Sequence, residues 1–209
     1  MSASTSAPKV RFEKTPNPQT FRFSLVGSDM VFAETPIAYS SAAEAQFAPL
    51  AKKLFGFPWA SGVFVGRDFI TVTKQDWVDW DIIAEPLAGL IEEHIESGAP
   101  IVSAVGSSSA SGESPSTGST SAGGSARHAV NPQDSAAIVL IKRVLDDEIR
   151  PMVAQDGGDV VFSKYEDQVV YLHMQGSCAG CPSSTMTLKM GIETRLKDAL
   201  PEIKEVVSV

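Results

Sequence analysis

A low-complexity stretch of 24 residues divides this chain and most constrains how it can fold. From Ser103 to Ala126, 21 of the 24 residues are Ser, Gly, Ala or Thr. Such a segment has almost no apolar surface to bury, so burial cannot offset the entropy lost on ordering. We therefore expect a flexible Ser/Gly-rich linker at 101–132, which joins an N-terminal domain at 8–100 to a C-terminal domain at 133–209.

The N-terminal part combines strand and helix patterns. Two short runs, Val10-Arg11-Phe12 and Phe21-Arg22-Phe23, alternate apolar and polar residues, as half-buried strands do. Two later stretches repeat apolar residues at helical spacing. Between the first two runs, Thr15-Pro16-Asn17-Pro18 forces a turn or an extended corner, because each proline fixes its own backbone. The strands are expected at 10–12, 21–23, 62–65 and 69–73, the last two joined in a hairpin by Gly66-Arg67-Asp68, and the helices at 43–54 and 83–95.

The C-terminal part predicts the order α-β-β-α-β. Its first helix has a core face of Ile138, Ile141, Leu145 and Ile149, and we expect Pro151 to help end it. The later elements are expected as strands at 160–162 and 169–174, a helix at 188–199 and a strand at 206–207. Both parts therefore predict small α+β domains rather than a doubly wound sheet.

The charge balance and the apolar runs exclude several classes of partner. The net charge is −8, and the longest basic clusters are the dipeptides Lys52-Lys53 and Lys142-Arg143, so nucleic acid is not an expected partner. No apolar run approaches the roughly 18 residues that a membrane span needs, so no membrane is expected either. The first ten residues show neither a signal nor a transit pattern. We expect a bacterial cytoplasmic protein, with a mature protein of the mitochondrial matrix as the alternative.

The cysteines carry the strongest chemical signal in the sequence. The chain has only two, Cys178 and Cys181, in the stretch Gly176-Ser177-Cys178-Ala179-Gly180-Cys181-Pro182 between a predicted strand and a predicted helix. This spacing lets two thiolates converge on one metal ion, and the partial positive charge at the helix start favours the thiolate of Cys181. Two cysteines exclude a disulfide-rich scaffold, and one chain alone cannot supply a four-cysteine site.

Three functions are compatible with this motif. The first is a thioredoxin-like dithiol oxidoreductase, although that motif usually belongs to a larger βαβ-based fold. The second is zinc, either bridging two chains or held in one chain with two of the histidines His94, His128 and His173. The third is an iron–sulfur cluster, for which two chains related by a two-fold axis would each supply Cys178 and Cys181.

Both parts of the sequence also resemble a known family. The C-terminal part resembles the NifU C-terminal domain of Nfu-type iron–sulfur carriers, and the N-terminal part resembles the Nfu N-terminal domain. The C-terminal resemblance is carried by Ile149-Arg150-Pro151, Asp156-Gly157-Gly158-Asp159 and Gly176–Thr185 with Leu188. The N-terminal resemblance is carried by Thr15-Pro16-Asn17-Pro18, Pro49-Leu50-Ala51, Leu54-Phe55, Gly62-Val63-Phe64-Val65 and Phe69–Lys74.

The resemblance implies a carrier rather than an enzyme. A member of this family would hold a [4Fe–4S] cluster between two protomers through Cys178 and Cys181, with a [2Fe–2S] cluster as the alternative, because four thiolates serve both. It would receive the cluster from iron–sulfur assembly proteins and deliver it to apo-proteins. The N-terminal domain would recognise donors or clients.

Overall fold

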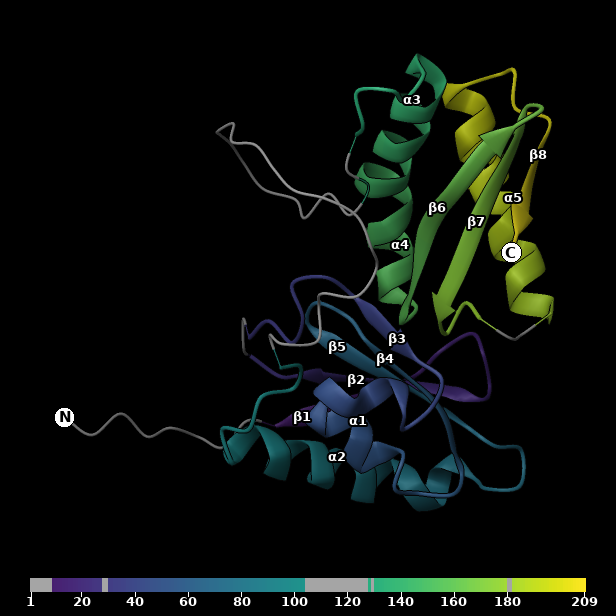
Figure 1. The fold of residues 1–209 in the computed structure, drawn as a ribbon. Coiled ribbons are helices and arrows are strands. Elements are labelled where there is room, and N and C mark those ends of the chain that lie inside the picture. Colours follow the sequence, from purple (N-terminus) through teal and green to yellow (C-terminus); the bar gives the residue numbers. More distant parts are fainter. Residues whose placement is uncertain (1–8, 28–29, 104–127, 129, 180–181) are drawn as a thin grey trace.

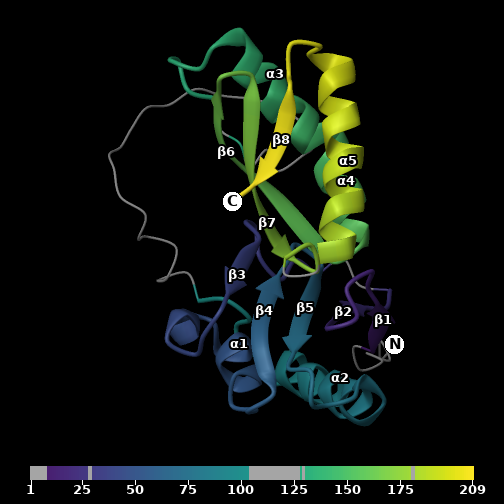
Figure 2. The same ribbon diagram turned by 90° about the vertical axis from the view of Figure 1, so that its right-hand side faces the viewer.

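The computed structural model describes residues 9–27, 30–103, 128, 130–179 and 182–209. They form two units with separate hydrophobic cores, one built from residues 10–101 and one from residues 141–206. In Figures 1 and 2 the C-terminal unit stands on one face of the N-terminal sheet. The predicted class, two small α+β domains, is confirmed. The centre of the predicted linker, 104–127, lies outside the described residues.

The N-terminal unit contains five strands: β1 (Val10–Lys14), β2 (Thr20–Leu25), β3 (Ile37–Tyr39), β4 (Ala60–Val65) and β5 (Phe69–Lys74). They form one antiparallel sheet in the order β1-β2-β5-β4-β3. The hairpin predicted around residues 66–68 is confirmed as the β4–β5 turn, whereas the short edge strand β3 was not predicted.

Helices cover one face of this sheet and form the first core with it. The 3₁₀ turn η1 (Glu44–Phe47) and α1 (Pro49–Leu54) replace the single helix predicted at 43–54, because Pro49 starts a new helix and leaves Phe47 exposed. The long helix α2 (Trp80–Glu96) confirms the second predicted helix. Figure 1 shows α2 on the side of the sheet away from the C-terminal unit.

The C-terminal unit has the predicted order α-β-β-α-β. A helical run, α3 (Ala136–Val144), η3 (Leu145–Ile149) and α4 (Arg150–Gln155), is followed by β6 (Gly158–Glu166), β7 (Val169–Gly176), α5 (Pro182–Ala199) and β8 (Glu205–Ser208). The sheet order is β6-β7-β8, with β6 and β7 antiparallel. Strands β7 and β8 are parallel, and α5 is their crossover.

The prediction that Pro151 helps end the first helix is wrong. The helical run continues past it to Gln155, and the five residues before α4 form a π-helical segment. A proline inside a helix lacks an N–H, and its ring clashes with the carbonyl four residues earlier. A π turn is one way for a helix to absorb such a break without ending.

Packing extends past the predicted domain boundaries at both ends of the linker range. Ile101 is buried in the N-terminal core, and His128 is buried against the C-terminal unit. The described part of the chain contains no helix long and apolar enough to cross a membrane.

Candidate metal-binding site

The cysteine motif lies in the connection between strand β7 and helix α5. Gly176, the last residue of β7, has a φ of +65°, which only glycine adopts without strain, and it turns the chain into the loop that contains Cys178. Helix α5 then begins at Pro182, six residues before the predicted range, and proline suits the first turn of a helix. Cys181 lies outside the described residues, so the predicted convergence of the two thiols stays a prediction.

The Cys178 thiol faces the interior of its own domain. The residue is 5% exposed and belongs to the second hydrophobic core. Burial raises the pKa of Cys178 to about 11, against a smaller opposing effect of the Ser177 hydroxyl, which lies 3.9 Å from Sγ. The sequence argument for an activated thiolate concerned Cys181. The thiol of Cys178 has the opposite character, protonated and inert at neutral pH.

The Asp156–Asp159 turn packs against the Cys178 loop and forms hydrogen bonds with it. Gly157 adopts a φ of +79°, and its carbonyl accepts the N–H of Ser177 at 3.1 Å. The Ser177 hydroxyl donates to the carbonyl of Asp156 at 2.5 Å. Gly158 packs so tightly under the thiol that any added Cβ would overlap Sγ of Cys178. The turn therefore packs directly against the Cys178 side chain and holds the loop that carries it.

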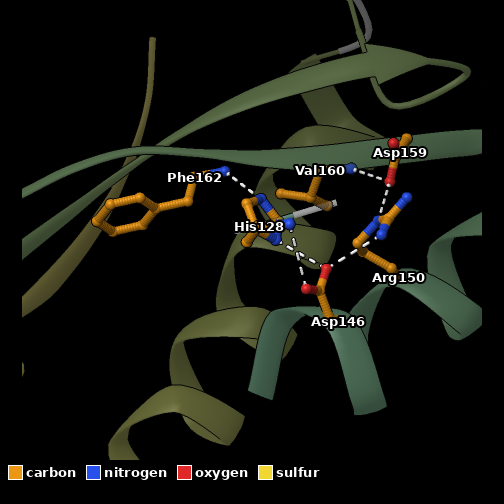
Figure 3. A network of polar contacts seen from close by, with 6 residues as sticks. All are labelled: His128, Asp146, Arg150, Asp159, Val160 and Phe162. Atoms are coloured by element: carbon orange, nitrogen blue, oxygen red, sulfur yellow. Dashed lines mark hydrogen bonds and ion pairs between the residues drawn. The ribbon is translucent and has the colours of Figure 1, made fainter. Parts of the chain in front are cut away.

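Asp159 is a structural anchor. It is buried, and its Oδ1 accepts from Nε of Arg150 and from the N–H of Val160, both at 2.9 Å. Arg150 also donates from Nη1 to Asp146 at 3.0 Å, so one guanidinium bridges two carboxylates (Figure 3). This buried arrangement ties the helical run to the start of β6, next to the cysteine loop.

His128 extends this network (Figure 3). Its Nε2 accepts the N–H of Phe162 at 2.8 Å, so that nitrogen carries no proton. The neutral ring then carries its proton on Nδ1 and donates to Asp146 at 2.8 Å. Sequence reasoning had placed His128 in the linker, because a single histidine beside a low-complexity stretch gives no local sign of burial.

We expect His128 to make the C-terminal unit less stable in mild acid. Burial lowers the pKa of His128 below the ordinary value of 6.5, against opposing effects of Asp146 and Asp159 and a supporting one of Arg150. As the pH falls below about 6.5, the unfolded chain therefore binds more protons than the folded one, and the free energy of unfolding falls. Urea unfolding at pH 7.5 and pH 5.5 measures this decrease.

The decrease should be smaller in His128→Gln than in the parent protein. His173→Gln is the matched control, because His173 is exposed and its Nδ1 lies 2.9 Å from the carbonyl of Val209. An equal pH dependence in His128→Gln and in the parent would contradict the assignment.

The three histidines lie apart from one another and do not build the single-chain zinc site. His94 is buried in helix α2, where its ring lies 3.2 Å from the carbonyl of Pro100, whereas His173 lies on β7 and His128 in the network above. Among the residues that the structure describes, no three His, Cys, Asp or Glu side chains are grouped as a metal site.

The N-terminal unit also contacts the cysteine loop, which the sequence did not predict. Asn17, at the tip of the turn between β1 and β2, donates to the carbonyls of Ser177 and Ala179 at 3.2 and 3.1 Å. Thr71 on β5 donates to the carbonyl of Gly157 at 2.6 Å. These contacts join residues more than 80 positions apart, so no local sequence pattern could predict them.

Sequence comparison identifies both units. The family described as "Scaffold protein Nfu/NifU N terminal" matches residues 10–98, and the family described as "NifU-like domain" matches residues 141–207. A protein of Drosophila sechellia named "NFU1 iron-sulfur cluster scaffold homolog, mitochondrial" is 36% identical over 200 residues, which cover 96% of this chain and 64% of the relative. The protein of the same name from Drosophila virilis is 34% identical over 200 residues, with 96% and 61% covered. The chain thus spans less than two thirds of the length of these relatives.

Two solved structures resemble part of the chain. A solution structure of a NifU-like protein from Saccharomyces cerevisiae has a TM-score of 0.44 and 21% identity, and the match covers 50% of this chain and 92% of that one. A crystal structure of protein SAV1430 from Staphylococcus aureus has a TM-score of 0.34 and 20% identity, with 40% and 98% covered. The two family matches follow each other in the predicted order, and the second contains both cysteines. The chain therefore belongs to the Nfu/NifU-like family, with an Nfu N-terminal domain followed by a NifU-like domain.

Proposed function

We propose that this protein is an iron–sulfur cluster carrier and not an enzyme. Two protomers hold one [4Fe–4S] cluster through Cys178 and Cys181 of each chain, and the cluster is delivered to apo-proteins. The observation that carries the proposal is a Cys-x-x-Cys motif inside a NifU-like domain whose relatives are named iron–sulfur cluster scaffolds. Two cysteines are half of the four thiolates that such a cluster takes.

The shared site explains how a carrier releases its cargo. Cys178 lies in the loop between the end of β7 and the start of α5, and one chain supplies only half of the four ligands. Thiolates of an acceptor protein replace the four ligands stepwise, and the two protomers separate as the cluster leaves. Donor proteins of the assembly machinery load the site by the reverse exchange.

The state of Cys178 argues against the dithiol oxidoreductase. A redox-active cysteine needs a lowered pKa and an accessible sulfur, whereas the thiol of Cys178 is buried and its pKa is raised to about 11. A metal ion supplies what this thiol lacks, because coordination deprotonates it outright.

The relatives' names also bear on the compartment. They are called mitochondrial, which favours the mitochondrial matrix over the bacterial cytoplasm expected first. In either compartment the partners are iron–sulfur assembly proteins and apo iron–sulfur clients, and the N-terminal domain recognises one or both of them.

Anaerobic reconstitution with iron and sulfide tests the proposal. We expect a brown protein with about four irons per two chains and a mass that doubles on loading. Cys178→Ala and Cys181→Ala should each lose the colour and nearly all of the iron. Met190→Ala is the matched control, because Met190 is an exposed sulfur-containing residue on helix α5, which follows the motif, and it should load like the parent.

Other outcomes would contradict the carrier function. A colourless protein that binds zinc would support the zinc-bridged module, and turnover of a dithiol substrate without iron would support the oxidoreductase. A cluster that survives either cysteine replacement would exclude these two residues as the ligands.

A further inference from the structure

The second face of the N-terminal sheet carries a row of three side chains, two of them buried, that does not belong to its own core. Arg22, Thr71 and Phe64 lie side by side on the neighbouring strands β2, β5 and β4. Thr71 is 0% and Phe64 3% exposed, yet neither is part of the N-terminal core. The other unit covers them, since Gly157 and Gly176 lie against this row.

The row and the cysteine domain are in close contact at two glycines. A Cβ on Gly157 would lie 2.8 Å from Oγ1 of Thr71, and a Cβ on Gly176 would lie 3.0 Å from Cδ1 of Phe64. Real Cβ atoms essentially never come within 3.0 Å of another atom, and few come within 3.4 Å. The two glycines that shape the cysteine loop are therefore also the points at which the N-terminal sheet touches the other domain.

Asn17, in the turn between β1 and β2, adds a polar contact between the two units. A hydrogen bond within its own domain fixes the orientation of its side chain. Oδ1 accepts the N–H of Gln19 at 3.0 Å, which leaves the amide nitrogen as the group that faces the other unit. The nitrogen donates to the carbonyls of Ser177 and Ala179, the two residues that flank Cys178. Asn17 is 2% exposed, so water does not compete for these bonds.

A bond to each neighbour of Cys178 limits how this residue can turn. As long as both carbonyls are held, the loop keeps the conformation in which the thiol packs into its own core. A thiol that serves a metal shared by two chains must leave that core. The second chain must also approach the end of the C-terminal unit that the N-terminal sheet covers (Figures 1 and 2).

We infer that three residues of the N-terminal domain, Asn17, Thr71 and Phe64, hold the cysteine loop in a closed conformation. We call these three residues the clasp. In the closed chain the clasp holds Cys178 turned inward, and it must release the loop before Cys178 becomes available to a ligand. That the ligand is an iron–sulfur cluster rests on the proposed function, whereas the closed state itself does not.

The alkylation rate of Cys178 in the metal-free protein tests the clasp. The full chain with Cys181→Ser leaves Cys178 as its one thiol, and iodoacetamide labelling followed by mass spectrometry reports how often the thiol is free. Asn17→Asp is the sharpest variant. It keeps an oxygen acceptor for the N–H of Gln19 and places a second oxygen against the two loop carbonyls.

We expect Asn17→Asp to speed the labelling of Cys178 by about tenfold or more. This corresponds to a loss of about 1.4 kcal/mol in the free energy that holds the loop closed. Thr71→Val keeps the shape of the side chain and removes its bond to Gly157, so it should act in the same direction with a smaller effect. Gln46→Ala is the matched control, because the Gln46 amide donates to a backbone carbonyl of its own domain, and the labelling rate should not change.

The outcomes separate the clasp from the proposed function. Unchanged labelling in both Asn17→Asp and Thr71→Val, with thermal unfolding showing folded proteins, would overturn the clasp and leave cluster binding untouched. Faster labelling together with a parent protein that never binds iron would support the clasp and overturn the proposed function.

Discussion

Replacement of Gly158 by alanine is expected to expel the Cys178 thiol from its pocket. An added Cβ would overlap Sγ of Cys178 and would lie 2.9 Å from the carbonyl oxygen of Gln175 on the paired strand. The strand is held by its ladder of hydrogen bonds, so the sulfur is the atom that moves. Overpacking of this kind costs about 1–3 kcal/mol of stability.

The chemical consequence should be an accelerated reaction of Cys178. Burial holds its pKa at about 11 instead of the ordinary 9.0. Loss of burial would raise the thiolate fraction at pH 7.5 about a hundredfold, and the lower intrinsic nucleophilicity of the more acidic thiol would return about a factor of ten. Iodoacetamide labelling of Gly158→Ala in the Cys181→Ser background should thus be about tenfold faster than in its parent.

Gly191→Ala is the control for this experiment. Gly191 lies in helix α5 of the same domain, and a Cβ there would meet no atom within 4 Å. The replacement should leave the labelling rate unchanged and add about 0.5–1 kcal/mol of stability, because alanine is the better helix former. A Gly158→Ala protein that labels as slowly as Gly191→Ala would mean that the pocket does not hold the thiol.

The local patterns in the sequence were enough to predict most elements of both domains. Alternating runs such as Phe21-Arg22-Phe23 and the helical repeat through Leu87 and Ile91 depend only on which face of an element is buried. The Gly-Ser-Cys stretch between strand and helix was recognisable for the same reason, since a turn, two thiols and a proline are all local features.

The misses have a common physical cause, which is that long-range packing overrides a local signal. Proline usually ends or kinks a helix. Here Pro151 lies within a helical run that the buried side chains of Leu145 and Ile149 hold against the core. The motif Thr15-Pro16-Asn17-Pro18 was interpreted as a turn, which it is. That its asparagine would reach a loop 160 residues away depends on the docking of two domains, and the sequence gives no period or spacing for that.

The alternation of β4 and β5 did contain one usable signal of this docking. Val63 and Val65 fill the N-terminal core, as do Ile70 and Val72, so Phe64 and Thr71 must lie on the other face of the sheet. A large aromatic residue at such a position is expected only where something covers that face. Continuous apolar character in residues 62–65 was thus a sign of a sheet buried on both sides.

Removal of Arg150 is expected to be the most destabilising single change in the charged network. Its guanidinium pairs with Asp146 at 3.0 Å and with Asp159 at 2.9 Å, and all three side chains are at most 13% exposed. Arg150→Met keeps much of the apolar stem and leaves two buried carboxylates without their cation. Breaking a buried pair in this way costs about 3–5 kcal/mol, measured as the free energy of unfolding in urea at pH 7.5.

Arg143→Met gives the matched comparison, because Arg143 pairs with Asp147 on the same helical run but both side chains are more than 60% exposed. An exposed pair of this kind is worth less than about 1 kcal/mol. If Arg150→Met cost no more than Arg143→Met, the network would not anchor β6 through its charges. Packing alone would then hold the Asp156–Asp159 turn against the cysteine loop.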